Sequence, residues 1–115
     1  MFIYHIIPQA DWRKALEIGS YQPESLAAEG FIHFSKPEQV CDTAQRYYVG
    51  RTDLMLLQVE TEKAVGEVKF ENTTGGEELF PHLYSLLNLD AVANVFNFPP
   101  NKDGTFSLPN AITLP

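Results

Sequence analysis

The apolar residues of this chain come in short runs, and that pattern most constrains what the chain can fold into. Phe2–Ile7, Phe31–Phe34, Leu54–Val59 and Ala91–Phe98 each hold only a few residues and are rich in β-branched or aromatic side chains. Proline or glycine borders most of these runs, which is typical of β-strands. None is long enough to cross a bilayer as a helix. The pattern predicts a soluble domain built around short strands.

Two segments carry the spacing of amphipathic helices instead. In residues 9–18, Trp12, Ala15 and Leu16 recur at helical spacing, and Gly19 stands where a helix commonly ends. The second helix is expected from Lys36 to the stop at Gly50, with Ser35 and Glu38 as a capping box at its start. Its apolar stripe consists of Val40, Cys41, Ala44, Tyr47 and Tyr48.

A further strand is expected over residues 67–72, where Val68 and Phe70 alternate with charged residues. Together the segments predict an α+β fold, a small single domain with a twisted, mixed or split sheet of about five short strands and two main helices. The length of 115 residues suits one domain. We assign residues 1–98 to this domain and residues 99–115 to a proline-containing C-terminal tail that packs on the surface.

Charge and cysteine content exclude several classes of protein. Eight Lys and Arg residues against fifteen Asp and Glu residues give a net charge of −7, which argues against a protein that grips a nucleic-acid backbone. The single cysteine, Cys41, cannot form a disulfide framework or a thiolate zinc site. The first residues lack the basic start of a signal peptide. We therefore expect a cytoplasmic protein without nucleic-acid or membrane partners.

Histidines are the leading candidates for chemistry. His5 and His33 both lie in predicted strands, and period-two alternation places His5 on one face with Ile3 and Ile7. Each imidazole either satisfies its two nitrogens within the core or lines a cleft shared by the two strands. The three histidines, His5, His33 and His82, show no His-x-His or His-x-x-x-His spacing, so no metal site is predicted.

Three other features leave similar alternatives. Ser35 is explained by the helix cap, although a helix N-terminus also attracts anions. Glu71 is either an exposed strand carboxylate or one that reaches the cleft. The segment from Phe80 to Tyr84 is expected to be a loop whose Phe80, Leu83 and Tyr84 are buried, with His82 beside the same cleft as His33. The same loop could instead be fastened only by local contacts.

Two blocks of sequence resemble a known family. Gly30-Phe31-Ile32-His33-Phe34-Ser35 and Phe80-Pro81-His82-Leu83-Tyr84, with the N-terminal Ile-Tyr-His-Ile, look like the bacterial domain-of-unknown-function family 952. The resemblance covers residues 2 to 98, nearly the whole chain. After Tyr84 the chain departs from the family's common Gly-Pro-Leu and reads Ser-Leu-Leu.

The resemblance implies an ADP-ribosyltransferase-like fold, a group of small split-sheet domains that bind NAD in a cleft. By position, His5 would be that fold's early-strand histidine, His33 and Ser35 its second-strand element, and Glu71 its late carboxylate. The functional hypothesis is a cleft that binds or processes NAD or a related nucleotide. The alternative is a non-catalytic domain that binds a small metabolite or a protein. The hypothesis gives catalytic roles to Glu71 and His33 and ligand-binding roles to His5, His33, Ser35, His82 and Tyr84.

Overall fold

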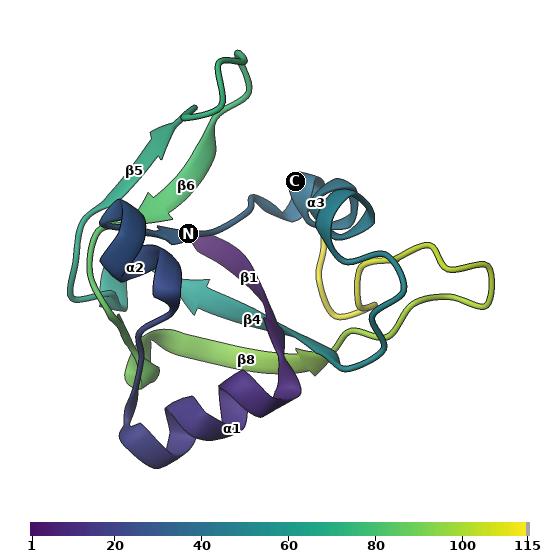
Figure 1. Ribbon diagram of the computed structural model, residues 1–115, viewed down its shortest axis with the longest axis horizontal. Helices are drawn as coiled ribbons and strands as arrows, with labels where there is room; N and C mark the ends of the chain where they lie inside the picture. Colours follow the sequence, from purple (N-terminus) through teal and green to yellow (C-terminus); the bar gives the residue numbers. More distant parts are fainter. Residues whose placement is uncertain (115) are drawn as a thin grey trace.

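A three-stranded antiparallel sheet forms the centre of the molecule. The computed structural model describes residues 1–114. In it β1 (Phe2–Pro8) pairs with β4 (Leu54–Glu60), which pairs with β8 (Val92–Asn97) across a register shift between Gln58 and Val59. Helix α1 (Gln9–Ile18) follows β1 directly and runs along one side of this sheet (Figure 1). The predicted strands at both ends of the chain thus meet on β4.

Two smaller sheets complete the fold. One has the order β3 (Ile32–His33), β6 (Phe80–Leu83) and β5 (Val68–Glu71), and the other pairs β2 (Ser20–Tyr21) with β7 (Leu87–Asn88). Figure 1 shows the β5–β6 hairpin extending away from the central sheet. An isolated bridge between Tyr4 and Ser35 joins β1 to the segment after β3.

The α+β class is confirmed, and the strands are divided among three sheets. Within residues 1–114 there are eight strands rather than about five, and every pairing is antiparallel rather than mixed. The predicted loop at Phe80–Leu83 is strand β6, although Pro81 lacks an N–H to donate. The carbonyl of Pro81 still accepts a hydrogen bond from the Phe34 N–H, at 2.9 Å.

The two predicted helices are present, and a third, short helix forms between them. Helix α1 ends at Gly19 in the left-handed conformation, with φ 96°, as its sequence predicts. Short helix α2 (Glu24–Glu29) ends in the same way at Gly30. The second predicted helix is a 3₁₀ turn, Pro37–Gln39, followed by α3 (Val40–Tyr47).

The predicted cap at Ser35 is wrong. The Ser35 backbone forms the bridge to Tyr4, so the chain is still extended there. The first helical turn begins at Pro37, one residue later than predicted. The Lys36 N–H donates to Oε1 of Gln39 at 2.9 Å. The Ser35 hydroxyl instead donates to Oγ1 of Thr43 at 3.4 Å.

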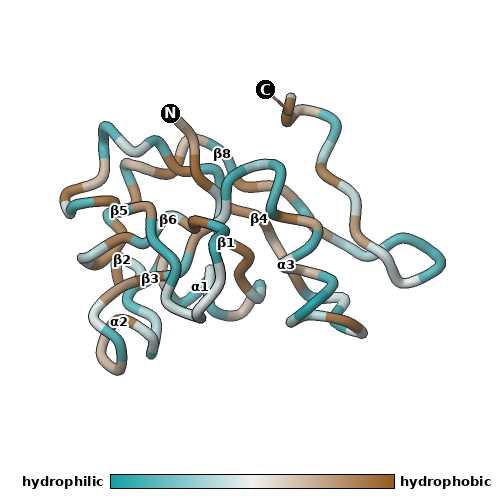
Figure 2. The backbone as a smooth tube through the Cα atoms, turned by 90° about the horizontal axis from the view of Figure 1, so that it is seen from above, coloured by the Kyte–Doolittle hydropathy of each residue, from teal (hydrophilic) through white to brown (hydrophobic). Residues whose placement is uncertain are grey.

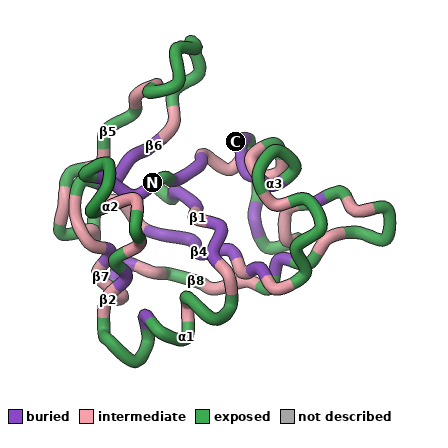
Figure 3. The backbone as a smooth tube through the Cα atoms, viewed as in Figure 1, coloured by how far each residue is buried: buried purple, intermediate pink, exposed green. Residues whose placement is uncertain are grey.

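Strands β1 and β4 of the central sheet are largely buried, whereas β8 is intermediate or exposed (Figure 3). Alternation along β1 and β4 sends Ile3, Ile7, Leu57 and Val59 into one core cluster, beside α1 and the smaller sheets. The other face contacts α3 and the C-terminal tail through a second cluster: Tyr4, Ile6, Val40, Ala44, Leu54, Leu56, Phe98, Phe106 and Ile112. The first four residues of β4, Leu54 to Leu57, are all hydrophobic, as the colour of this strand in Figure 2 reflects, in keeping with burial on both faces.

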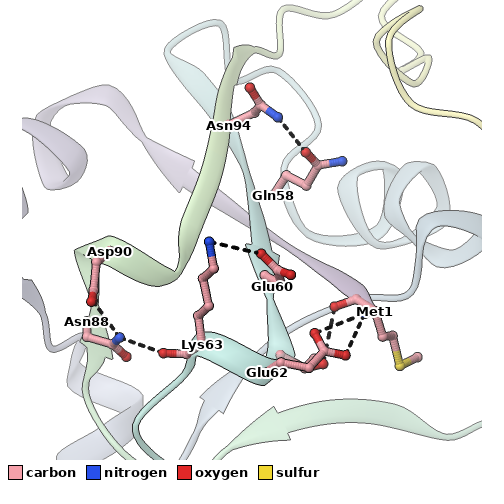
Figure 4. A network of polar contacts seen from close by, with 9 residues as sticks. Met1, Gln58, Glu60, Glu62, Lys63, Asn88, Asp90 and Asn94 are labelled. Carbon is pink, nitrogen blue, oxygen red and sulfur yellow. Dashed lines mark hydrogen bonds and ion pairs between the residues drawn. The ribbon is translucent and has the colours of Figure 1, made fainter.

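Polar contacts join the start of β1 to the turn that follows β4 (Figure 4). The N-terminal ammonium of Met1 contacts the Glu62 carboxylate at 2.7 Å, just after β4 ends. The Asn88 side chain donates to the carbonyl of Lys63 at 2.8 Å and so links β7 to the same turn. In the described part of the chain, no helix is long and apolar enough to cross a membrane.

Candidate functional site

A cavity of about 640 Å³ lies where β1, β3, β6, α3 and the start of α2 meet. Four of the residues predicted to form a site line it: His5, His33, Ser35 and His82. Glu71 and Tyr84 do not line it but lie behind His82, in hydrogen-bond contact with one another. A cavity of this size is typical of sites for small organic molecules.

His82 is the most constrained of these residues. It is only 3% exposed, and its ring stacks on Phe31 with 4.2 Å between centroids. Its Nδ1 donates to Oε1 of Glu71 at 3.0 Å. Within residues 1–114 no group hydrogen-bonds to Nε2, and the ring lines the cavity. One nitrogen of His82 is therefore held by a carboxylate, and the other has no hydrogen-bond partner within residues 1–114, on a ring that lines the cavity.

Glu71 is the carboxylate that contacts Nδ1 of His82. Its carboxylate accepts hydrogen bonds from the Tyr84 hydroxyl and from His82. The bond from Tyr84 and then the bond from His82 hold the pKa of Glu71 below its usual range, and Lys69 adds to the effect. The same contact raises the pKa of Tyr84. Glu71 is thus an ionised acceptor that fixes the orientation of His82.

His33 lies directly across the β3–β6 ladder from His82. The two rings are nearly perpendicular, with centroids 5.3 Å apart. His33 is exposed, and its Nε2 lies 3.2 Å from a carboxylate oxygen of Glu29. Two carboxylate–histidine pairs therefore stand side by side at the cavity.

His5 is held differently, because both of its ring nitrogens are engaged. Nδ1 lies 2.6 Å from the carbonyl oxygen of His33, and Nε2 lies 3.0 Å from the Tyr21 hydroxyl. Burial is the main cause that lowers the pKa of His5 from 6.5 to about 4. At neutral pH the ring is uncharged, and it lines the cavity as a fixed wall that also orients Tyr21.

The expected burial of the Phe80–Tyr84 segment is only partly met. Leu83 is fully buried and Phe80 is half-buried, but Tyr84 is 37% exposed. Tyr84 follows the last residue of β6, and Nζ of Lys69 lies over its ring, 4.9 Å from the centroid. Its role in the structure is the contact with Glu71.

Several lining residues were not singled out from the sequence. Asp11 comes from the first turn of α1, Tyr21 from β2, Glu24 from α2, and Arg46 and Tyr48 from α3 and its end. Tyr48 was interpreted only as part of an apolar helix stripe. The others carry no shared spacing, so the sequence held no signal that they meet. No group of three His, Cys, Asp or Glu side chains within residues 1–114 is placed to hold a metal ion.

The fold and the cavity define a small α+β domain with a histidine-lined pocket. Residues 6–95 match the family described as protein of unknown function, DUF952, and the chain belongs to that family. The family resemblance inferred from the histidine blocks is therefore confirmed. No curated protein matches the chain.

Solved structures of a bacterial relative support the fold. The crystal structure of protein CC0527 from Caulobacter crescentus is 34% identical, with a TM-score of 0.82, over 93% of this chain and 94% of that one. Its solution NMR structure is 35% identical, with a TM-score of 0.79, over 90% of each chain. The similarity extends over nearly the whole domain.

Proposed function

We propose that the cavity binds a small organic molecule and that His82 exchanges a proton with it. One observation carries the proposal: His82 is a buried imidazole in the wall of a cavity of about 640 Å³, with Nδ1 held by a carboxylate and Nε2 without a hydrogen-bond partner within residues 1–114. A histidine that served only the core would have partners for both nitrogens, as His5 has.

The hydrogen-bond partners define the roles. A carboxylate can only accept, so neutral His82 carries its proton on Nδ1 and offers Nε2 as a base. The negative charge of Glu71 would stabilise the imidazolium that forms when Nε2 takes a proton. Glu71 is then a positioning residue, while His82 is the group that meets the ligand. His33, whose ring is 5.3 Å away, can supply a second acid or base.

NAD or a related nucleotide is the narrower form of this proposal, and it rests on the ADP-ribosyltransferase-like resemblance. A ribose hydroxyl could donate to Nε2 of His82. A pyrophosphate would meet one cationic lining residue, Arg46, together with the carboxylates of Asp11 and Glu24. The same cavity without a proton-transfer step would make the domain a non-catalytic metabolite-binding module.

Thermal denaturation in the presence of NAD, ADP-ribose, nucleosides and a fragment library tests binding. A ligand at 100 times its Kd should stabilise the protein by about 2.7 kcal/mol and should shift the side-chain NMR signals of His82. If no compound shifts those signals, the cavity is not a binding site. Binding without any chemical change of the ligand would support the non-catalytic form.

Glu71→Gln tests the role of the carboxylate. The amide can donate to Nδ1, so the variant should lose the preference for the Nδ1-protonated form of His82, which imidazole ¹⁵N shifts report. Ligand binding should survive, and turnover of any substrate found should fall by about 10²-fold.

Glu71→Asp keeps the charge and should restore part of the activity. Glu67→Gln is the matched control, since Glu67 is an exposed glutamate beside the same hairpin without contact to His82. An unchanged His82 tautomer in Glu71→Gln would contradict the assigned role.

A further inference from the structure

We propose that the ligand of this cavity is an organic cation with N–H donors, an amine or guanidine on an apolar body, rather than an anionic nucleotide. The inference rests on the proposed binding function and names its ligand class. It follows from which hydrogen-bonding groups the cavity offers and which charges line it.

The His5–Tyr21 pair presents an acceptor. The carbonyl of His33 can only accept, so Nδ1 of His5 must carry the ring proton, and Nε2 of the neutral ring must accept. The Tyr21 hydroxyl therefore donates its proton to Nε2 over 3.0 Å. The Tyr21 oxygen can therefore only accept a hydrogen bond from a ligand in the cavity.

In His82 and His33 too, when the ring is neutral, a partner that can only accept keeps the ring proton on the nitrogen that it contacts. The Glu71 carboxylate holds the proton of His82 on Nδ1, so the unpartnered Nε2 is an acceptor. The Glu29 carboxylate likewise holds the proton of His33 on Nε2. His82 is only 3% exposed. A ligand that displaced water from Nε2 without donating a hydrogen bond to it would leave this buried nitrogen unpaired, which costs binding free energy. A donor on the ligand satisfies it.

Charge points in the same direction. Asp11 and Glu24 line the cavity, and neither forms an ion pair within the described part of the chain. Burial raises the pKa of Tyr21, and the negative charge of Asp11 raises it further, so the field of that carboxylate reaches the phenol. Arg46 is the one cationic side chain of Lys or Arg type among the lining residues of the described chain. The whole chain carries −7, which attracts cations and repels phosphates.

The walls suit an apolar body. The aromatic residues Tyr4, Tyr21, Phe34 and Tyr48 also line the cavity. Faces of such rings attract a positive charge and cover the hydrocarbon attached to it. Carboxylates, acceptor nitrogens and aromatic faces together are the groups that recognise an alkyl- or arylammonium ion.

Matched probes of one shape and three charges test the ligand class. Binding of 2-phenylethylamine, 2-phenylethanol and phenylacetate is measured at low salt by NMR titration of His82 and by thermal shift, with agmatine and NAD alongside. The amine should bind at least about tenfold more tightly than its neutral and anionic counterparts. Added salt should weaken its binding.

Variants locate the effect. Asp11→Asn and Glu24→Gln should each weaken amine binding about fivefold without changing binding of the alcohol. Glu17→Gln, an exposed glutamate on the same helix as Asp11 that does not line the cavity, should leave both unchanged. Both substituted sites are exposed, so the variants should stay folded, and loss of one carboxylate from the first turn of a helix should lower the melting temperature only slightly.

The outcomes separate this inference from the proposed function. Tighter binding of phenylacetate or NAD than of the amine overturns the cation assignment and leaves a binding cavity in place. Equal affinity for all three matched probes overturns it as well. If no probe of any charge perturbs His82, the binding function itself fails.

Discussion

His5 shows how a single residue couples burial to pH. Its ring is enclosed beside Tyr21 and Phe34, with centroid separations of 5.2 and 5.3 Å. Desolvation lowers its pKa from 6.5 to about 4, against the bond to the His33 carbonyl, which favours the protonated ring. Between those two pH values the unfolded chain takes up a proton that the folded chain does not, so stability is full above pH 6.5 and falls as the pH drops.

Replacement of His5 should therefore change the pH dependence of stability. The wild type should lose about 2 kcal/mol of unfolding free energy at His5 between pH 7 and pH 5. His5→Gln should be less stable at pH 7 but should show a correspondingly shallower decline over this range. Urea denaturation at several pH values measures both slopes.

Thr52→Gln serves as the control because Thr52 is exposed and carries no titratable group. Its decline from pH 7 to pH 5 should match that of the wild type. A decline in His5→Gln as steep as in the wild type would show that the His5 ring is protonated in the folded state.

At the scale of elements, Gln39 connects helix α3 to the strand that carries His82. Its Oε1 accepts from the Lys36 N–H at 2.9 Å. Its Nε2 donates to the carbonyl of Leu79 at 2.8 Å and to Glu78 at 3.1 Å, just before β6. One buried side chain thus caps the first turn and holds the start of β6, which helps to place His82.

Gln39→Leu should cost about 1–3 kcal/mol of unfolding free energy, because the part-buried Lys36 N–H and Leu79 carbonyl lose the partner that Gln39 supplies. Denaturant midpoints of the variant and the wild type measure the cost. Gln45→Leu makes the same change at an exposed position of α3 and should cost less than about 0.5 kcal/mol. Equal costs at the two positions would show that Gln39 is not a structural link.

Across the whole molecule, the central sheet is stabilised by two cores, and the C-terminal tail completes one of them. Phe106 is 7% exposed and stacks on Phe98, with 5.2 Å between ring centroids. Ile112 is buried in the same cluster as Tyr4 and Ile6 of β1. The tail therefore contributes to the face of the sheet that contacts α3.

Phe106→Ala should destabilise the protein by about 3 kcal/mol, since it opens a cavity in this cluster. Leu114→Ala is the matched control in the same tail, at a side chain that is exposed, and should be close to neutral. Calorimetric or denaturant unfolding compares them. A Phe106→Ala midpoint no lower than that of Leu114→Ala would mean that the tail does not contribute to the core in solution.

Local pattern alone predicted much of the fold. β1, α1 and β4 have strong periodicity and clear ends, such as Gly19 after α1, and they lie close to where the sequence places them. β6 was missed because Pro81 is typical of loops; its place between β3 and β5 depends on partners far away in sequence. The cap was assigned to Ser35 because Ser-x-x-Glu is a local pattern, whereas the bridge between Ser35 and Tyr4 is a long-range contact.

By itself the sequence determined the class of the fold, the family and the histidines that deserved attention, because composition, periodicity and short motifs are properties of neighbouring residues. The tertiary structure decided what those histidines can do. It gave His5 two partners and left Nε2 of His82 open, and it placed Glu71 behind His82 rather than on the cavity. Hydrogen-bond roles, desolvation and the charge of a cavity depend on groups brought together from distant segments, and no local pattern records those distances.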